Sequence, residues 1–334
     1  MAHVLGSASN LAIRTAGLRR VYTPRGGDPV VALDGIDLEV RRGELFGVLG
    51  PNGAGKTTLI KILVTLLAPS EGVAEVDGLD VVRDFRILRP RIAMVSGGEN
   101  SGYGMLTVRE QLWMFSQFYG LPSRVVRPRI DEYLHRLGLF EARDRAVSAL
   151  SSGMRQKMNL IRGLVTEPRV LFLDEPTVAL DVGAARDVRV EVRRWMGEDS
   201  DRTVILTTHY MAEADELCDR IAIVNRGRVV ALGTPASLKG AVARETTVDL
   251  DVGAGGDILA TLRTLDGVVG ATTIRAGDAA ERLTVILSGD AVLGRVITTI
   301  EGRGRGVLGL RKREASLEEA FVRLVGSGID EADR

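Results

Sequence analysis

The segment Gly50–Thr57 reads GPNGAGKT and matches the pattern G-x-x-x-x-G-K-[S/T] at every fixed position. It follows the apolar run Glu44–Leu49 (ELFGVL) and opens the stretch Lys56–Leu67, which reads as a helix stopped by Pro69. A strand, a glycine loop and a helix in this order aim successive backbone N–H groups and the positive end of a helix at phosphate oxygens. The sequence therefore predicts binding of ATP or GTP.

Two side chains of this segment have expected roles beyond the backbone cradle. Lys56 supplies a movable positive charge for the β and γ phosphates, and the hydroxyl of Thr57 suits Mg²⁺. The expected nucleotide contacts of the segment are Gly50, Pro51, Asn52, Gly53, Ala54, Gly55, Lys56, Thr57 and Thr58.

A second apolar run, Val170–Leu173, ends in two acidic residues, Asp174 and Glu175. An aspartate at the end of such a strand can hold Mg²⁺ through water. Glu175 stands one residue further into the loop, where it can accept a proton from the attacking water or orient it. Together with the phosphate loop, this pair predicts nucleotide hydrolysis.

Strands alternate with helices along most of residues 11–240, which indicates a largely parallel sheet covered on both faces. Two short strands are expected between Leu18 and Val40, around a Gly/Pro-rich turn. Residues 97–165 form a helical insert, whose first helix opens with a capping box of Thr107 and Glu110. The other expected elements are strands at Ile92–Val95, Val170–Leu173 and Thr203–Thr207, helices at Asp181–Met196 and Met211–Asp219, and a hairpin around Asn225–Gly227.

Further motifs in this order make the chain resemble an ATP-binding cassette (ABC) ATPase. LSSGMRQK at 150–157 resembles the family's LSGGQ signature, with Ser151 and Gly153 kept but Ser152 and Met154 replacing the usual Gly and Gln. EPTVALD at 175–181 resembles the segment that ends in the family's aspartate, here Asp181. Thr207, Thr208 and His209 resemble the switch histidine at a strand end, and Tyr22 matches the aromatic residue that stacks on adenine.

The resemblance implies a homodimer in which two cassettes pack head to tail through their nucleotide sites. Ser151 and Gly153 would then present hydroxyl and N–H donors to the γ-phosphate held by the other subunit. His209 would contact the γ-phosphate and keep the water and Glu175 aligned. ATP and Mg²⁺ are the implied ligands, and the catalytic residues would be Glu175, His209 and Lys56.

One element of the family pattern is missing. After the strand Ile92–Val95 the family places a glutamine that contacts Mg²⁺, but this chain has SGGEN at 96–100. The glutamine position falls on Gly97 or Gly98, depending on alignment. Glu99 or Asn100 supplies the oxygen instead, or water fills the position and the loop serves only coupling.

Residues 241–334 read as a separate small α+β unit. Its elements, in the order βαββαβ of the ferredoxin-like motif, are expected at 246–252, 257–265, 267–274, 282–287, 290–301 and 307–312. A last helix begins at Ser316, which forms a capping box with Glu319. The unit carries no nucleophile, metal cluster or glycine loop, so we expect a dimerisation or regulatory role. The fold class is thus an α/β phosphate-loop ABC cassette with an antiparallel N-terminal portion, followed by this unit.

Charge and hydropathy restrict the partners. Lys plus Arg and Asp plus Glu both number 44, so nucleic acid is not expected. The one cysteine, Cys218, cannot form an internal disulfide, which fits a reducing compartment. No run of 18 uncharged apolar residues occurs. Any membrane role must therefore come through a separate integral-membrane permease that holds the chain at the cytoplasmic face.

A single cassette followed by a short unit ending in REASLEEAFVRLVG resembles the ATPases of drug, antibiotic and sodium exporters, of the daunorubicin-resistance and sodium-extrusion kind. The alternatives are an importer ATPase and a soluble ABC protein that acts on ribosomes or DNA. In this family the permease docks beside the helical insert, here Gly98–Tyr119. The aromatic residues Trp113, Phe115 and Phe118 form either that docking surface or the core of the insert.

Overall fold

The computed structural model describes residues 10–24, 26–97, 103–242, 246–253, 255, 258–275, 280–313 and 316–326. The chain divides into two compact units, Met1–Pro235 and Ala236–Arg334. The division coincides with the start of helix α8 (Pro235–Val242), whereas the sequence places the boundary at residue 240. Each unit has a hydrophobic core of its own.

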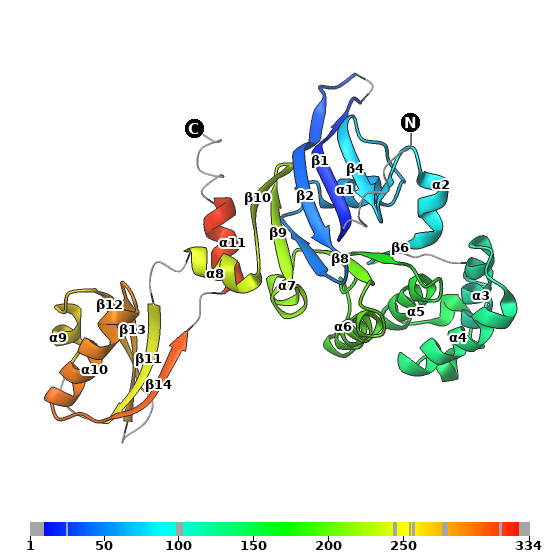
Figure 1. Cartoon of the computed structure of the whole chain (residues 1–334). Coiled ribbons are helices and arrows are strands. Elements are labelled where there is room, and N and C mark those ends of the chain that lie inside the picture. Colours follow the sequence, from blue (N-terminus) through cyan, green and yellow to red (C-terminus); the bar gives the residue numbers. More distant parts are fainter. Residues whose placement is uncertain are drawn as a thin grey trace. The chain divides into compact units, whose positions relative to one another are not determined.

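A six-stranded sheet of order β10-β9-β3-β8-β7-β6 forms the centre of the first unit (Figure 1). The five strands from β9 to β6 are parallel, and β10 is antiparallel to β9. The prediction of a largely parallel core sheet is therefore confirmed. Its strands are β3 (Leu45–Leu49), β6 (Ile92–Ser96), β7 (Val170–Asp174), β8 (Thr203–Thr208), β9 (Arg220–Asn225) and β10 (Arg228–Gly233). The expected hairpin at Asn225–Gly227 is the turn between β9 and β10.

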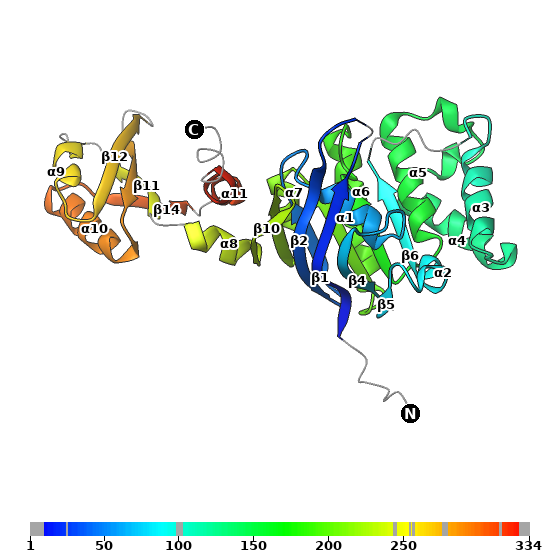
Figure 2. The same cartoon turned by 90° about the horizontal axis from the view of Figure 1, so that it is seen from above.

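An antiparallel sheet of order β2-β1-β4-β5 lies over one face of the central sheet (Figure 2). Its strands are β1 (Leu11–Tyr22), β2 (Val30–Arg41), β4 (Glu71–Val76) and β5 (Leu79–Asp80). The expectation of short strands between Leu18 and Val40 was wrong in length, since β1 and β2 each span 12 residues. Bulges at several points of the β1–β2 pairing blur the alternation of apolar residues that would have revealed the full strands.

Helices cover both faces of the central sheet. Helix α1 (Lys56–Leu63) lies between the two sheets, and α5 (Ser152–Leu164), α6 (Val182–Gly197) and α7 (Met211–Leu217) pack on the opposite face (Figure 1). The expected helix over Lys56–Leu67 is too long. Thr65 adopts a left-handed backbone conformation with φ of 64°, and the N–H groups of the next two residues return to the carbonyl of Lys61. This cap ends the helix before Pro69 is reached.

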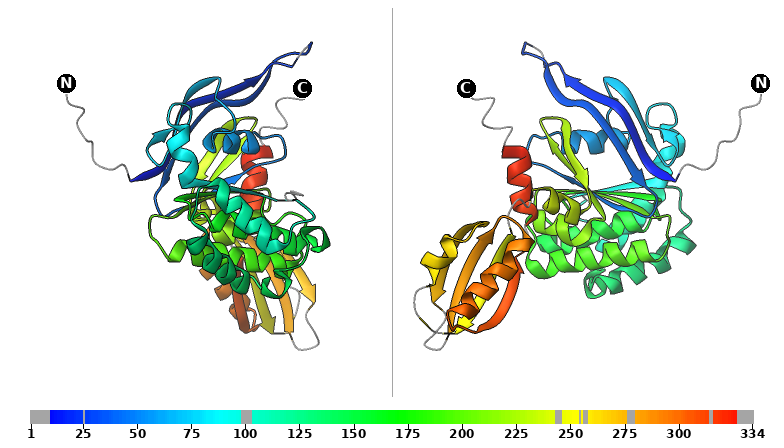
Figure 3. Two further views of the ribbon diagram at one scale, coloured as in Figure 1. Left: turned by 90° about the vertical axis from the view of Figure 1, so that its right-hand side faces the viewer. Right: turned by 60° about the vertical axis from the view of Figure 1, so that its left-hand side comes forward.

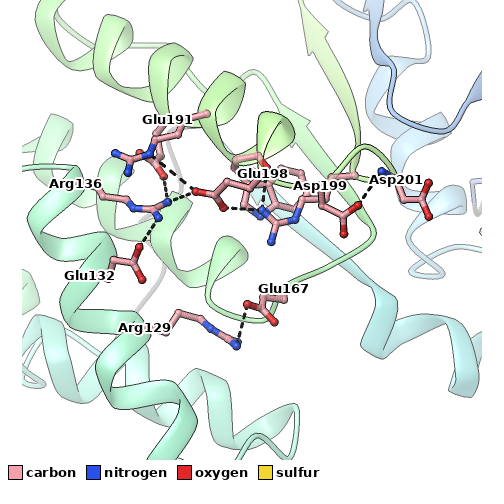
Figure 4. Close-up of polar contacts among 11 residues, drawn as sticks. Arg129, Glu132, Arg136, Glu167, Glu191, Glu198, Asp199 and Asp201 are labelled. Carbon is pink, nitrogen blue, oxygen red and sulfur yellow. Dashed lines mark hydrogen bonds and ion pairs between the residues drawn. The ribbon is translucent and has the colours of Figure 1, made fainter.

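The helical insert consists of α3 (Val108–Phe118), α4 (Ser123–Arg136) and the start of α5, and the capping box of Thr107 and Glu110 is present as predicted. The guanidinium of Arg136 joins α4 to α6 by contacting Glu132, Glu191 and Glu198 (Figure 4). Nearby, Arg129 pairs with Glu167 at 2.9 Å. The insert is thus fastened to the rest of the unit by buried or half-buried ion pairs.

The second unit has the predicted βαββαβ order. Its sheet has the order β12-β13-β11-β14, which is the strand order of a ferredoxin-like fold, with α9 and α10 on one face (Figure 3). The elements are β11 (Thr246–Gly253), α9 (Leu259–Arg263), β12 (Val268–Arg275), β13 (Ala280–Leu287), α10 (Leu293–Gly302), β14 (Val307–Arg313) and α11 (Leu317–Gly326). The capping box of Ser316 and Glu319 is confirmed by both reciprocal hydrogen bonds.

Across the described ranges, we find no helix that is both long enough and apolar enough to cross a membrane.

Candidate functional site

The phosphate loop connects β3 to α1 at the carboxyl end of the central sheet. Gly55 immediately precedes α1 with φ of 105°, and a Cβ atom there would lie 2.4 Å from the carbonyl oxygen of Ala32. Only glycine meets both conditions. Ala54 is buried and donates its N–H to the carbonyl of Pro51 at 3.2 Å, while Asn52 and Gly53 are exposed. The loop is therefore a tight backbone turn with its central residues open to a ligand.

Lys56 is held inside this turn. Its ammonium group donates hydrogen bonds to the carbonyls of Gly50 at 2.8 Å and Pro51 at 3.1 Å, and the residue is 5% exposed. Burial lowers the pKa of Lys56, and the carboxylates of Glu175 and Asp174 oppose that shift. Lys56 thus offers a positive charge next to the phosphate cradle, at 3.8 Å from Oε1 of Glu175.

The two acidic residues at the end of β7 face different partners. Asp174 is buried and accepts a hydrogen bond from the hydroxyl of Thr207 on the neighbouring strand β8. Glu175 has left the strand, with φ of 51°, and its N–H donates to the carbonyl of Thr207 at 3.0 Å. Its side chain is 27% exposed, so the carboxylate faces an accessible site while the backbone is fixed.

His209 follows β8 and approaches the same carboxylate. Its Nδ1 lies 3.2 Å from Oε1 of Glu175, and its ring packs against Tyr210 with centroids 4.2 Å apart. The same oxygen of Glu175 thus lies within 4 Å of both Lys56 and His209. Three residues from three separate loops converge on one point, an arrangement able to bind a phosphoryl group and to take up a proton beside it.

The residues expected to hold Mg²⁺ have suitable chemistry. Thr57 is exposed at the start of α1, and Asp174 is the last residue of β7. A hydroxyl and a carboxylate oxygen are therefore available as metal ligands. Mg²⁺ in such sites takes one or two protein oxygens and completes its shell with phosphates and water. The described residues contain no group of three or more His, Cys, Asp or Glu arranged to bind a metal. Glu99, together with Gly98 and Asn100, lies outside the described residues.

Gly97 is in direct contact with the acidic loop. Its N–H donates to the carbonyl of Asp174 at 2.8 Å. A Cβ atom at position 97 would lie only 1.8 Å from the carbonyl oxygen of Glu175. Glycine at this position lets the segment after β6 approach the acidic loop more closely than any side chain would allow.

Tyr22 lies at the end of β1, on the same side of the unit as the start of α1. Its hydroxyl is 3.5 Å from the hydroxyl of Thr58, and the residue is 37% exposed. The guanidinium of Arg20 lies 4.9 Å from the centre of its ring. Tyr22 is therefore close to the phosphate loop and accessible to a planar ligand.

Ser151, Gly153 and Asp181 form a second group. Ser151 caps α5 by accepting the N–H of Met154, and Asp181 caps α6 by accepting the N–H of Ala184 at 2.8 Å. A Cβ atom at Gly153 would lie 3.1 Å from Cβ of Ala184, so the two helix starts touch. Within the part of the chain that the structure describes, none of these hydrogen bonds reaches the phosphate loop.

A groove of about 530 Å³ separates the helical insert from β6 and the end of α1. Phe115 and Phe118 of α3 line it and pack edge to face with ring centroids 5.7 Å apart. Phe118 is 70% exposed, and Trp113 is also partly exposed, whereas Leu112 is buried. The sequence left two interpretations of these aromatic residues, a docking surface or the core of the insert. The exposure of Phe118 fits a surface position, and other residues form the core of the insert.

Sequence reasoning assigned no supporting role to Thr177 and Glu213, and it named Thr207 and Thr208 only as part of the motif that contains His209. Glu213 is 5% exposed and accepts a hydrogen bond from Thr177 at 2.8 Å. The signal was present, because an acidic residue on the inward side of a short helix needs a partner. That partner could not be identified before the fold brought residue 177 beside residue 213.

Comparison with known proteins gives consistent matches. A family model described as "ABC transporter" matches residues 33–178. The daunorubicin resistance ATP-binding protein DrrA3 of Streptomyces coeruleorubidus is 39% identical, over 88% of this chain and 91% of the relative. The Nod factor export ATP-binding protein I of Ralstonia nicotianae is 33% identical over 96% of both chains.

Solved structures share the fold of the first unit. The ATP-binding subunit of an ABC transporter superposes with a TM-score of 0.62 at 26% identity, covering 69% of this chain and 92% of that one. A dimeric ATP-binding cassette, MJ0796, bound to ADP and phosphate, gives a TM-score of 0.61 at 24% identity, covering 66% of this chain and 98% of the other.

Proposed function

Because the chain belongs to the ABC transporter family and is an ATP-binding cassette ATPase, we propose that it is the ATP-hydrolysing subunit of an exporter and drives a separate membrane permease. The observation that supports hydrolysis at this site is the convergence of Lys56 and His209 on one carboxylate oxygen of Glu175. Export is supported by relatives that align along nearly the whole chain and whose names concern drug resistance and Nod factor export.

In the mechanism that we propose, the loop Gly50–Thr57 and Thr58 bind the triphosphate of ATP, and Tyr22 stacks on adenine. Lys56 neutralises charge on the β and γ phosphates. Glu175 accepts a proton from the attacking water, and His209 keeps that water and the carboxylate aligned. Mg²⁺, held by Thr57 and Asp174, would neutralise charge that develops on the phosphate oxygens. Glu99 stays our candidate for a further metal ligand.

We further propose that two copies of the chain form the complete site. ABC cassettes dimerise, as in the dimeric MJ0796 cassette. Ser151, which is exposed, and Gly153, which is buried, stand at the start of α5 and would donate to the γ-phosphate bound by the second copy. Asp181 would complete the same contact. Donors aimed at phosphoryl oxygens stabilise the charge of the transition state.

Such ATP-binding subunits work with a transmembrane component, and the groove beside α3 is our candidate docking surface for it. Its rim combines the exposed ring of Phe118 with two guanidinium groups, Arg162 over the ring of Phe115 at 4.6 Å and Arg89 beside the end of α1. A short cytoplasmic helix of a permease fits a groove of this kind. The chain would then sit at the cytoplasmic face of the membrane as a peripheral subunit, and the C-terminal unit would serve dimerisation or regulation.

Co-purification with a membrane protein encoded by a neighbouring gene tests the exporter proposal. We expect Phe118→Asp to lose the membrane partner while ATP binding is kept, because a charge replaces an apolar contact in the groove. Val190→Asp is the matched control, since Val190 is also an exposed apolar residue but belongs to α6. Two results would favour the importer alternative. One is co-purification of the wild-type chain with the components of a transporter that uses a secreted binding protein, and the other is transport toward the cytoplasmic side of the membrane in inverted vesicles.

A further inference from the structure

The loop of Glu175 and the loop of His209 are joined by a third residue, Glu213 of α7. Thr177, two residues after Glu175, donates its hydroxyl to Oε1 of Glu213 at 2.8 Å. The side chain of Thr208, immediately before His209, lowers the pKa of the same carboxyl group. One buried acidic residue thus contacts both of the segments whose tips meet at the catalytic point.

The Thr208 hydroxyl accepts the N–H of Tyr210 at 3.0 Å, and its own proton remains available for donation to a carboxylate. Thr177 and Thr208 are themselves buried, at 9% and 1% exposure. The two hydroxyl groups and the carboxyl of Glu213 therefore form a polar contact inside the unit, with little access to bulk water.

A buried carboxyl group of this kind is costly to keep. Burial raises the pKa of Glu213, and the hydroxyls of Thr208 and Thr177 oppose that shift. Its second oxygen, Oε2, is buried and makes no hydrogen bond of normal geometry to any described residue. An apolar side chain would fill the position at lower cost, so retention of a carboxyl points to a task beyond packing.

We propose that Glu213 is a positioning residue for hydrolysis, which fixes the loop of Glu175 relative to the loop of His209. It does not touch the reacting atoms. The inference rests on the catalytic roles proposed for Glu175 and His209. Its effect is on the 3.2 Å separation between Nδ1 of His209 and Oε1 of Glu175, because the carboxyl group of Glu213 accepts the Thr177 hydroxyl and lies beside the side chain of Thr208.

The test uses the full chain and its variants. Glu213→Leu removes both acceptor oxygens but keeps an apolar side chain in a buried place, whereas Glu213→Gln keeps an acceptor oxygen for Thr177, and its amide group can donate to the second lone pair of the Thr208 hydroxyl. Glu216→Leu is the control on the same helix, since Glu216 is largely exposed and pairs with Arg189 at 3.3 Å. Steady-state ATP hydrolysis gives kcat and KM, and thermal unfolding reports folding.

We expect Glu213→Leu to lower kcat by about tenfold to a hundredfold, the range produced by small misplacements of reacting groups, while the KM for ATP changes by less than about threefold. Glu213→Gln should recover most of the lost kcat, and Glu216→Leu should behave as wild type. Thr177→Val should reproduce part of the loss and should not add to that of Glu213→Leu, because both remove the same contact.

Two outcomes would overturn the proposal. A folded Glu213→Leu variant with wild-type kcat would show that the contact is irrelevant to turnover. Equal losses in Glu213→Leu and Glu213→Gln, with KM and thermal stability changing in parallel, would indicate a purely structural role. A Glu175→Gln variant assayed beside them separates the two levels. If Glu175→Gln is inactive, wild-type turnover in Glu213→Leu contradicts only this inference. If Glu175→Gln is active, both the proposed site and this inference are wrong.

Discussion

Glu175 combines a reactive side chain with an unusual backbone. Its φ of 51° lies in the left-handed region, which costs a non-glycine residue about 1–3 kcal/mol unless its surroundings fix it. Here the surroundings do so from two sides. Its N–H is bound to the carbonyl of Thr207, and its own carbonyl is bound by the N–H of Val178 at 3.2 Å. The strain is thus located at the residue to which we assign the proton transfer.

Gly97 lies in close contact with the backbone of Glu175, and this contact gives a prediction. A methyl group at position 97 would overlap the carbonyl of Glu175, so the acidic loop would have to move. We expect Gly97→Ala to lower ATP turnover about tenfold or more, since small displacements of a catalytic group are costly, and to lower the free energy of unfolding by about 1–3 kcal/mol.

The control is Gly197→Ala in α6, where an added methyl group meets no atom within 4 Å. Phosphate release and thermal unfolding give the two readouts. Wild-type turnover in Gly97→Ala would mean that the segment after β6 can withdraw without affecting hydrolysis.

Local sequence motifs name the candidate site residues but not the residues that support them. The phosphate loop, Asp174, Glu175 and His209 are recognisable because each stands at a strand end within a short motif. Gly97 was recognised only as a departure from the family pattern. Its contact with Glu175, like the contact of Thr177 with Glu213, joins segments far apart in the sequence. Such pairs depend on strand order, which no local pattern contains.

At the scale of elements, the attachment of the helical insert depends on Arg136. This residue of α4 contacts Glu191 of α6 and Glu198, which immediately follows α6, and Glu191 is only 3% exposed (Figure 4). Burial raises the pKa of Glu191, while the hydrogen bond and charge of Arg136 lower it. The arginine therefore makes a buried carboxylate tolerable.

Arg136→Met should be strongly destabilising near neutral pH. Removing one partner leaves Glu191 buried without its counter-charge, which typically costs about 3–5 kcal/mol. Arg194→Met is the matched control, because Arg194 is exposed and lies 3.9 Å from Glu198. Its effect should stay below about 1 kcal/mol. Urea unfolding of both variants measures the difference.

The pH dependence has a definite sign. A carboxyl whose pKa is raised in the folded state binds its proton more tightly there than in the unfolded chain, so stability falls as pH rises through the folded pKa. Without Arg136 that pKa rises further above the ordinary 4.5 of Glu191. The loss in Arg136→Met should therefore be smaller at about pH 5 than at about pH 8. A loss independent of pH would indicate that packing, not charge, holds α4 to α6.

Element boundaries show where sequence patterns fail. The start of α3 was predicted because its capping box lies within four consecutive residues, Thr107–Glu110. The end of α1 was not, because it depends on the left-handed conformation of Thr65, a residue with no special preference for it. Pro69, which the sequence suggested as the end of the helix, lies beyond Leu66 and Leu67, whose N–H groups already bind the carbonyl of Lys61.

At the scale of the whole molecule, each of the two compact units has hydrophobic packing of its own. One buried cluster includes residues of α1 and of both sheets of the first unit, and another is confined to the ferredoxin-like unit. The order of its six elements was predictable because each is short and bounded by turn residues. Its role was not predictable in the same way and remains a proposal.

Two cores predict two unfolding transitions. Calorimetry of the full chain should resolve them, because separate domains unfold as separate cooperative units. Mg²⁺ and ATP should stabilise only the first unit. Its free energy of unfolding should rise by about 2.7 kcal/mol when ATP is a hundredfold above its Kd. For this measurement Glu175→Gln prevents hydrolysis during the scan. One transition that shifts as a whole would contradict the independence of the two units.

The account depends most on Glu175 as the proton acceptor of an ATPase. The direct measurement is phosphate release from Mg-ATP by the full chain, wild type and Glu175→Gln side by side, with size-exclusion chromatography of both in ATP. We predict that the variant loses turnover by at least about 10²-fold, the usual contribution of a general base, and that ATP traps it as a dimer. An unimpaired rate of phosphate release in Glu175→Gln would contradict the account.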